Sequence, residues 1–343
     1  MDCVRAVADV VLYEGYLLWP YRRSALKNQQ RWTIGGVYPR PYAERTGDHS
    51  TVRAEFLLET GFLTDTGFPT DTGFPTDTAG SGPDVEFTLR FLHAVHRQVM
   101  DGDAPVDEIR DGDETFTTWQ EAREREITSG RVSVARLLRS PVRVPVAVAA
   151  GAEDEEIGGA ARFTRLWQRV DGTIEISAAE AGDGAVRLRV EVVNTGSAED
   201  RDGAVHAGML CAHVVARAGG GAAFVSLTDP PARMAEAAAA CASDGLWPVL
   251  AGSPGSHDTV LAAPIVLYDW PQVAPESPGD MFDGTEIDRL LILSVLSLSD
   301  DERREMAATD PRAAQILERC GALSSDELLT LHGTMRDPRK DVW

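Results

Sequence analysis

The alternation of apolar and polar positions predicts short β-strands along most of the chain. In residues 85–95 the positions 85, 87, 89 and 91 are apolar, and those between them are polar. A period of two is typical of a strand with one buried face. Residues 185–194 show the same pattern, and residues 173–177 precede them at hairpin distance. Further strands are predicted at 4–18, 31–40, 51–58, 142–148, 220–229 and 259–270.

Pro145 places the strand predicted at 142–148 on a sheet edge, because proline cannot donate to a β-ladder. Short alternating strands joined by glycine-rich turns favour an antiparallel, sandwich-like body. We therefore expect an α+β protein, in which residues 1–270 form a β-rich body of antiparallel sheet.

Helix signals concentrate towards the C-terminus. Beyond an alanine-rich helix predicted at 230–245, Asp310 and Pro311 place a cap residue before a proline at the first helical position. Three further pairs have the spacing of N-terminal capping boxes, Thr285 with Asp288, Ser299 with Glu302 and Ser324 with Glu327. We predict an acidic loop and C-terminal helices at 271–332, followed by a tail at 333–343.

One true repeat interrupts the strand pattern. Residues 61–78 read GFLTDT, GFPTDT and GFPTDT, and a glycine-rich run follows. Three such units are too short to stack into a solenoid. We expect a disordered insertion at about 60–83.

The net charge of −21 over 343 residues changes the set of expected partners. So acidic a chain repels phosphate backbones and anionic lipids, which argues against nucleic acid and membrane as partners. No apolar run approaches the ~20 residues that span a bilayer. The N-terminal apolar run contains acids, unlike a secretory signal, and four scattered cysteines form no CxxC pair. We expect a cytoplasmic protein.

Catalytic signatures are missing: the chain has no GxSxG elbow, P-loop, HExxH motif or zinc-finger spacing. The best metal-like set is His206, Cys211 and His213, but two converging ligands on one strand do not make a site. His93 lies on the apolar face of its strand and is expected in the core, whereas His96 is expected in solvent. We predict neither a metal site nor a cofactor.

The acid-rich segment 268–288 leads into the first C-terminal helix. Its carboxylates include Glu276, Asp280, Asp283 and Glu286. They are compatible with helix capping and solvation, with binding of an arginine-rich partner, or with a cation or catalytic site. The spacing does not match an EF-hand loop.

Residues 13–32 combine aromatic residues with the densest basic patch of this acidic chain. Aromatic residues beside arginines are typical of protein interfaces, and the same set could stack on a flat ligand. We expect a strand running into a basic turn, with some of the aromatic residues buried and the arginines presented. The turn is expected to recognise acidic groups, either of residues 276–288 or of a partner protein. The residues chosen here are Tyr16, Trp19, Tyr21, Arg22, Arg23 and Arg31.

Four segments resemble a family of functionally uncharacterised proteins from GC-rich bacteria that are encoded beside NiFe-hydrogenase genes. They are LYEGYLLWPYRRSALKNQQRW, AAFVSLTDPP, IVLYDWPQVAPESPGDMFDGTEID and TDPRAAQILERC. The resemblance spans most of the chain, excludes the GFPTDT repeat and transfers no functional residue. It implies an accessory role around a multi-subunit redox enzyme, with hydrogenase subunits or maturation factors as partners.

The expected function is therefore that of a non-catalytic accessory or assembly protein that binds other proteins. The alternative is a metal-dependent enzyme that uses the carboxylates of residues 268–288, with His213 as a further ligand. The metal content of the purified protein separates the two.

Overall fold

The computed structural model describes residues 3–29, 31–60, 82–112, 114–158, 161–273, 281–282 and 288–323. Residues 61–81, which contain the repeat, and the tail predicted at 333–343 lie outside this part of the chain.

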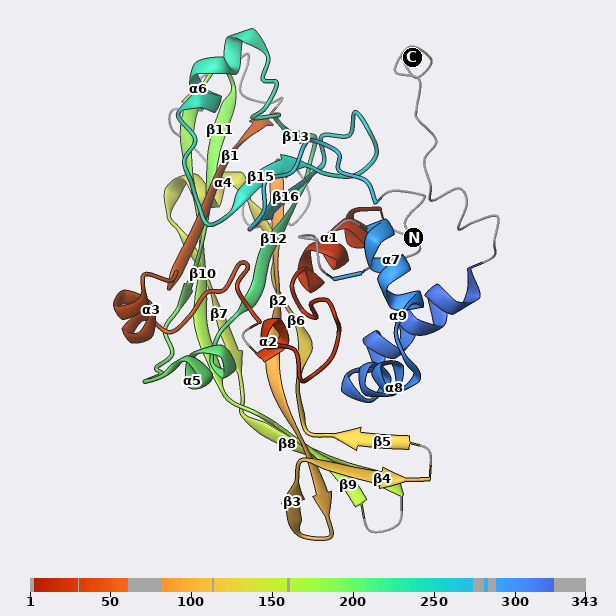
Figure 1. Ribbon diagram of the computed structural model, residues 1–343. Coiled ribbons are helices and arrows are strands. Elements are labelled where there is room, and N and C mark those ends of the chain that lie inside the picture. The colour runs from red at the N-terminus through yellow and green to blue at the C-terminus, as the bar shows by residue number, and fades with distance from the viewer. Residues whose placement is uncertain are drawn as a thin grey trace.

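Two antiparallel sheets form the body, as Figure 1 shows. The six-stranded sheet has the order β13 (Ala222–Phe224), β1 (Thr51–Thr60), β11 (Ala185–Asn194), β10 (Val170–Gly182) and β7 (Val142–Val148), with β14 (Ser243–Asp244) pairing β1. The eight-stranded sheet has the order β15 (Trp247–Leu250), β16 (Thr259–Ala263), β12 (Leu210–Gly219), β2 (Asp84–Asp101), β9 (Ala161–Trp167) and β8 (Gly151–Gly158), with β3 (Ala104–Val106) and β6 (Trp119–Ser133) pairing β2.

The main core lies between these sheets and follows the alternation in the sequence. Inward-facing residues of β1, β10 and β11 meet those of β2 and β12, and all are buried. Phe56 of β1 packs against Phe87 of β2, with ring centroids 6.1 Å apart. The predicted hairpin of residues 173–177 with 185–194 is confirmed, and β7 is an edge strand as Pro145 predicted. The α+β, sandwich-like class is confirmed.

Helices cover the outer face of the eight-stranded sheet. Helix α1 (Cys3–Tyr13) packs on β12 and β16, and α7 (Asp288–Leu296), α8 (Asp300–Thr309) and α9 (Pro311–Ala322) lie beside it (Figure 1). The capping box of Ser299 with Glu302 and the Asp310 cap of α9 are confirmed. Thr285 and Ser324 lie outside the described residues.

Smaller elements connect the layers. A two-stranded sheet of β4 (Glu108–Asp111) and β5 (Glu114–Thr117) projects from the lower end of the body in Figure 1. The short helices are α2 (Leu26–Gln29), α3 (Arg40–Thr46), α4 (Val134–Arg139), α5 (Arg201–His206), η1 (Ala232–Met234) and α6 (Ala235–Ala239).

Several predicted elements differ from the structure. Residues 4–18, predicted as a strand, form α1 and an irregular segment, because Val4, Val7, Ala8 and Val11 recur at helical spacing and bury one face. Residues 31–40 make one isolated bridge, Val37 to Met209, and no strand. The helix predicted at 230–245 is shorter, consisting of η1 and α6. The strands predicted at 220–229 and 259–270 reduce to β13 and β16.

None of the helices within the described residues has the length and apolar character needed to cross a bilayer. All four cysteines carry free thiols, and Cys211 and Cys320 are buried. Burial raises the pKa of the Cys211 thiol to about 12.

Candidate functional site

The basic and aromatic segment 13–32 is folded into the molecule rather than displayed as a strand. Tyr16, Tyr21 and Arg31 are at most 3% exposed. These three predicted partner-binding residues therefore face the interior, which corrects the expectation that the arginines of this segment are all presented. Trp19 is half-buried and packs edge-on against Tyr21, with centroids 5.7 Å apart.

A buried asparagine holds this segment in its irregular course. The Asn28 carboxamide accepts from the backbone N–H of Leu18 at 2.8 Å and donates to the carbonyls of Leu18 and Arg22 at 2.7 and 3.1 Å. Tyr21 and Trp32 both have left-handed backbone, with φ of 60° and 68°. Bulky residues rarely adopt this conformation, so the surrounding contacts must fix it. A regular strand cannot satisfy these contacts.

Arg31 lies in a cage of aromatic rings. Its guanidinium carbon is 4.1 Å from the ring centroid of Trp119, 4.7 Å from that of Trp32 and 5.2 Å from that of Tyr16. Nη1 donates to the Tyr16 carbonyl at 2.6 Å, and Nη2 donates to the carbonyl of Gln120. Burial lowers the pKa of Arg31. Desolvation of this kind strengthens the attraction between the cation and the rings.

A buried hydrogen bond joins this cage to the C-terminal helices. The Tyr16 hydroxyl donates to Asp310 Oδ2 at 2.6 Å, while Asp310 Oδ1 accepts from the backbone N–H of Arg312 and so caps α9. Burial, followed by the Asp310 charge, raises the pKa of Tyr16 well above its usual value. The N-terminal segment is thus bonded to the start of α9.

Replacing Tyr16 with phenylalanine is expected to lower the free energy of unfolding by about 2 kcal/mol. The change leaves the ring in place but removes the donor to a buried carboxylate, and hydrogen bonds to charged groups contribute about 1.5–3 kcal/mol. Urea denaturation provides the measurement. Tyr268→Phe is the matched control, because Tyr268 is 88% exposed. Equal stability of Tyr16→Phe and wild type would show that the bond contributes nothing net.

Arg22 pairs with α8. Its Nη1 lies 3.1 Å from Glu302 Oε1 and 3.9 Å from Glu305 Oε2. Basic residues of the segment therefore do meet acidic groups of the same chain, but these acids belong to α8. The predicted acidic residues Glu276, Asp280, Asp283 and Glu286 lie outside the described residues. At Met281, which is described, the backbone carbonyl accepts a hydrogen bond from the Tyr21 hydroxyl at 2.6 Å.

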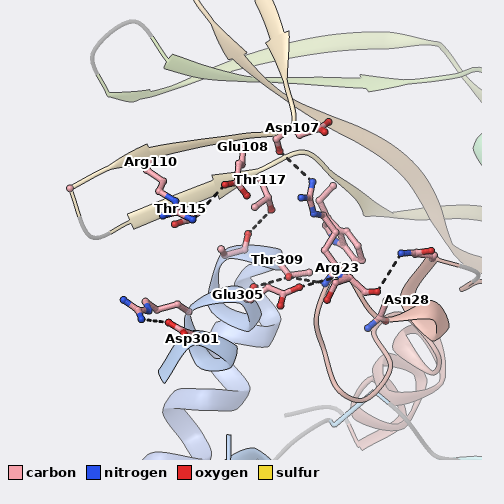
Figure 2. A pocket seen from close by; sticks show the side chains of 16 residues that line it. Arg23, Asn28, Asp107, Glu108, Arg110, Thr115, Thr117, Asp301, Glu305 and Thr309 are labelled. Carbon is pink, nitrogen blue, oxygen red and sulfur yellow. Dashed lines mark hydrogen bonds and ion pairs between the residues drawn. The ribbon is translucent and has the colours of Figure 1, made fainter. Parts of the chain in front are cut away.

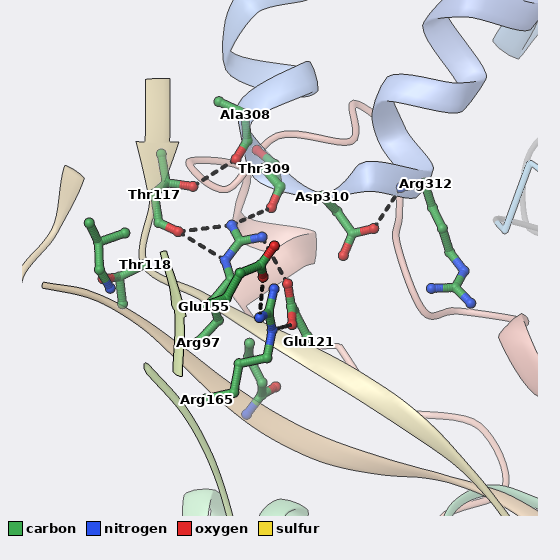
Figure 3. Close-up of polar contacts among 12 residues, drawn as sticks. Arg97, Thr117, Thr118, Glu121, Glu155, Arg165, Ala308, Thr309, Asp310 and Arg312 are labelled. Carbon is green, nitrogen blue, oxygen red and sulfur yellow. Dashed lines mark hydrogen bonds and ion pairs between the residues drawn. The ribbon is translucent and has the colours of Figure 1, made fainter. Parts of the chain in front are cut away.

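A buried ion-pair network supports the end of α8 from below (Figure 3). Arg97 of β2 pairs with Glu121 at 2.8 Å and donates to the carbonyls of Thr117 and Thr309. Glu121 also accepts from Arg165 at 2.7 Å. A cation beside the last carbonyls of a helix complements the helix dipole. The sheet thereby fixes where α8 ends.

A charged cavity of about 890 Å³ opens between three separate parts of the chain, as Figure 2 shows. The segment 23–29, the β4–β5 hairpin and α8 form its walls. Arg110 pairs with Glu108 at 3.7 Å, and Arg304 pairs with Asp301. Its charged lining residues are Arg23, Asp107, Glu108, Arg110, Asp301, Arg304 and Glu305.

A second cavity of about 710 Å³ adjoins the first. Arg23 and Trp119 line both, so we treat the two as lobes of one cleft, the charged lobe and the tryptophan lobe. The tryptophan lobe is formed mainly by β2, β6, β9 and α5 with the segment before β8. Its lining includes Leu166, Trp167, His96, His206, Gln120 and Asp202. His96 is half-buried here rather than fully solvated.

The histidines and cysteine of the metal-like set have other contacts. His213 is fully buried, and its Nδ1 lies 3.1 Å from the Cys211 carbonyl oxygen. Cys211 Sγ is 3.4 Å from the carbonyl oxygen of Glu14, and His206 lies 3.2 Å from the Gln120 amide. Across the described ranges, three or more His, Cys, Asp or Glu residues nowhere gather in a way that could hold a metal ion. His93 is in the core, as predicted.

The described part of the acid-rich segment has a structural contact of its own. Asp269 accepts hydrogen bonds from the hydroxyls of Ser226 and Thr228 at 2.5 and 2.7 Å, and from the backbone N–H of Leu250 at 2.8 Å. This carboxylate thus connects the segment after β13 with β15.

Compared with known proteins, the chain matches no family model and no curated protein. The cleft is therefore interpreted from its own residues. Of the predicted site residues, Arg23 lines both lobes, and Arg31 lies directly beneath Trp119. Trp119, Asp107 and the charged α8 residues that line the cleft (Asp301, Arg304 and Glu305) were not singled out by any sequence pattern.

Proposed function

We propose that this protein is a non-catalytic accessory or assembly protein that binds a segment of another protein in the two-lobed cleft. The resemblance to proteins encoded beside NiFe-hydrogenase genes suggests hydrogenase subunits or maturation factors as partners, in the cytoplasm. The observation that carries the proposal is the composition of the cleft. Trp119 and Arg23 line both lobes, Trp167 lines the tryptophan lobe, and charged residues of both signs line the charged lobe. Aromatic and arginine anchors within a polar rim are typical of protein-binding sites.

The arrangement of the walls supports the same proposal. The segment 23–29 is held against α8 by the ion pairs of the preceding residue, Arg22, and by a hydrogen bond from the Ser24 backbone N–H to Glu305 at 3.2 Å. Thr117 of β5 donates to the Ala308 carbonyl at 2.9 Å and fixes the hairpin against α8. These contacts preorganise the cleft, which lowers the ordering cost of binding.

Charge reversal at the rim is expected to abolish co-purification of the partner. We expect Arg110→Glu to remove the captured chains when the tagged protein is isolated from its native cell, because it alters the field of the charged lobe. Arg143→Glu on β7 is the matched control, since the two arginine side chains are 76% and 73% exposed and each pairs with one glutamate. Mass spectrometry identifies the captured chains.

The two variants distinguish binding of the partner in the cleft from binding elsewhere on the surface. Loss with Arg110→Glu and retention with Arg143→Glu supports binding in the cleft. If both variants retain the same chains as wild type, the partner binds elsewhere. A purified protein that turns over a substrate would contradict the non-catalytic assignment.

A further inference from the structure

We propose that the centre of the cleft binds a carboxylate of the partner segment, and that the tryptophan lobe takes an aromatic side chain next to it. The inference rests on the proposed function and specifies its ligand, an acidic peptide with an aromatic anchor. Two groups at the junction of the lobes carry the argument, the indole N–H of Trp119 and the guanidinium of Arg23.

The indole N–H of Trp119 is a buried donor whose acceptor is missing. Trp119 is 7% exposed, and its Nε1 has no hydrogen-bond partner among the described residues. Leaving such a donor unpaired is unfavourable, and buried polar groups of native proteins nearly always find a partner. Trp119 lines both lobes, so a ligand at their junction would contact this side chain, and we take an oxygen atom of that ligand as the missing acceptor.

Arg23 brings a positive charge that no carboxylate of the described chain neutralises. Its Nη1 donates only to the backbone carbonyls of Asp107 and Thr118, each at the long distance of 3.4 Å. Its neighbour Arg22 instead forms ion pairs with α8. Arg31, directly beneath Trp119, likewise donates to backbone carbonyls.

Arg23 lines the same two lobes as Trp119, and the Arg31 guanidinium carbon lies 4.1 Å from the Trp119 ring centroid. Neither arginine has a carboxylate partner among the described residues, in a chain of net charge −21. An arginine fork and an N–H donor together match the oxygens of a carboxylate.

The loop that carries Arg23 is held before any ligand arrives. Asn28 fixes both ends of the turn through Leu18 and Arg22, and the backbone N–H of Arg23 donates to the Thr309 hydroxyl at 3.2 Å. Figure 2 shows the Arg23 side chain reaching from this turn towards Asp107. A fixed donor loses little entropy on binding.

The tryptophan lobe suits a flat apolar group. Trp167 and Trp119 contribute aromatic surface, and Leu166 is 46% exposed on β9 at the same lobe. His96 and His206 add two further rings. An aromatic side chain that packs there would bury this surface while its neighbouring carboxylate reaches Arg23.

The negative charge of Asp107 repels an acidic ligand and therefore lowers the affinity of the cleft for it. Its side chain is exposed in the lining of the charged lobe and forms no ion pair within the described residues. Glu108 and Asp301, in contrast, pair with Arg110 and Arg304. Removal of the Asp107 charge should strengthen binding of an anion and weaken binding of a cation.

A random heptapeptide library displayed on phage provides the test. Selection on the intact protein is expected to enrich sequences with Phe, Tyr or Trp next to Asp or Glu. A synthetic peptide of the selected consensus is then titrated by calorimetry against its glutamine or asparagine analogue. We expect the acidic form to bind at least tenfold more tightly.

Four variants assign the interaction to the two groups. Arg23→Gln is expected to reduce affinity for the acidic peptide at least tenfold, and Trp119→Phe, which keeps a ring above Arg31 but lacks the N–H, by about tenfold. Asp107→Asn is expected to increase affinity about threefold. Arg143→Gln is the control and should bind as wild type does. Thermal unfolding of each variant verifies that the fold is intact.

Selection of basic or purely aliphatic peptides, or of none, would overturn the proposal, as would equal binding of the acidic and amide peptides. An acidic peptide that binds Arg23→Gln and wild type equally well would also overturn it. Such results leave the co-purification test with Arg110→Glu unaffected, so failure of this inference is distinguishable from failure of the proposed function.

Discussion

Replacing Arg97 with alanine is expected to lower the free energy of unfolding by about 3–5 kcal/mol, the range for breaking a buried ion pair. The guanidinium is 3% exposed and bonds to Glu121 and to the carbonyls of Thr117 and Thr309. Its loss leaves these carbonyls without their donor in a buried site. The C-terminal end of α8 also loses the cation that complements its dipole.

The Arg97→Ala substitution should destabilise the C-terminal helices more than it destabilises the six-stranded sheet. Because Arg97 connects β2 with α8, hydrogen exchange in α8 and α9 is expected to accelerate more than exchange in β10 and β11, which belong to the other sheet. Urea denaturation gives the change in stability. Arg143→Ala, which breaks an exposed pair with Glu175, should change stability by at most about 1 kcal/mol.

Arg97→Lys separates charge from geometry. Lysine keeps the positive charge, but its single ammonium group cannot bond to one carboxylate and two carbonyls at once. We therefore expect an intermediate decrease of about 2 kcal/mol in the free energy of unfolding. If Arg97→Ala is as stable as wild type, then the network in Figure 3 does not hold α8 in place.

The sheets could be predicted from the sequence because one buried face imposes a period of two. Val186, Leu188, Val190 and Val192 alternate with polar residues, and all four are fully buried in β11. The caps of α8 and α9 were predictable for a similar reason, since Ser299 and Asp310 act on residues two to three positions away. Patterns that depend on near neighbours remain visible in one sequence.

The conformation of residues 13–32, in contrast, could not be predicted from local sequence patterns. Its aromatic content favours a strand, yet Tyr16 and Tyr21 bond to Asp310 and Met281, about 260 to 290 positions later in the chain. Contacts between residues so far apart in the sequence leave no periodic pattern of apolar and polar residues within the segment. Tertiary bonds with Asn28 and the C-terminal helices decided the conformation, overriding strand propensity.

The cleft was hidden for the same reason. Its walls come from residues 23–29, the β4–β5 hairpin and α8, which meet only after both sheets and the C-terminal helices have assembled (Figure 2). Trp119 belongs to no motif. The sequence did indicate Arg23, because a dense basic patch is unusual in so acidic a chain.

Lowering the pH from 7 to 5 is expected to destabilise the protein, and His213 alone should contribute about 2 kcal/mol of this loss. Burial lowers the pKa of His213 to about 4 from an ordinary 6.5, and the nearby charge of Arg90 acts in the same direction. The hydrogen bond to the Cys211 carbonyl and the charge of Asp9 partly oppose the shift. His93 has a pKa lowered to about 4 by burial and by Arg125, so it adds a loss of the same sign.

The direction follows from proton binding. Below pH 6.5 the unfolded chain binds a proton at residue 213 that the folded protein binds only near pH 4, so stability falls as the pH drops through this window and levels off below it. Each unit of pKa difference corresponds to about 1.4 kcal/mol.

His213→Asn isolates this contribution. Asparagine keeps a donor near the Cys211 carbonyl but cannot titrate, so the variant should lose about 2 kcal/mol less than wild type between pH 7 and pH 5 in urea denaturation. His49→Asn is the control for replacing a histidine outside the core, because the His49 side chain is 52% exposed. Identical slopes for His213→Asn and wild type would mean that His213 is protonated inside the folded protein at pH 5, with the buried charge stabilised by a neighbour such as Asp9.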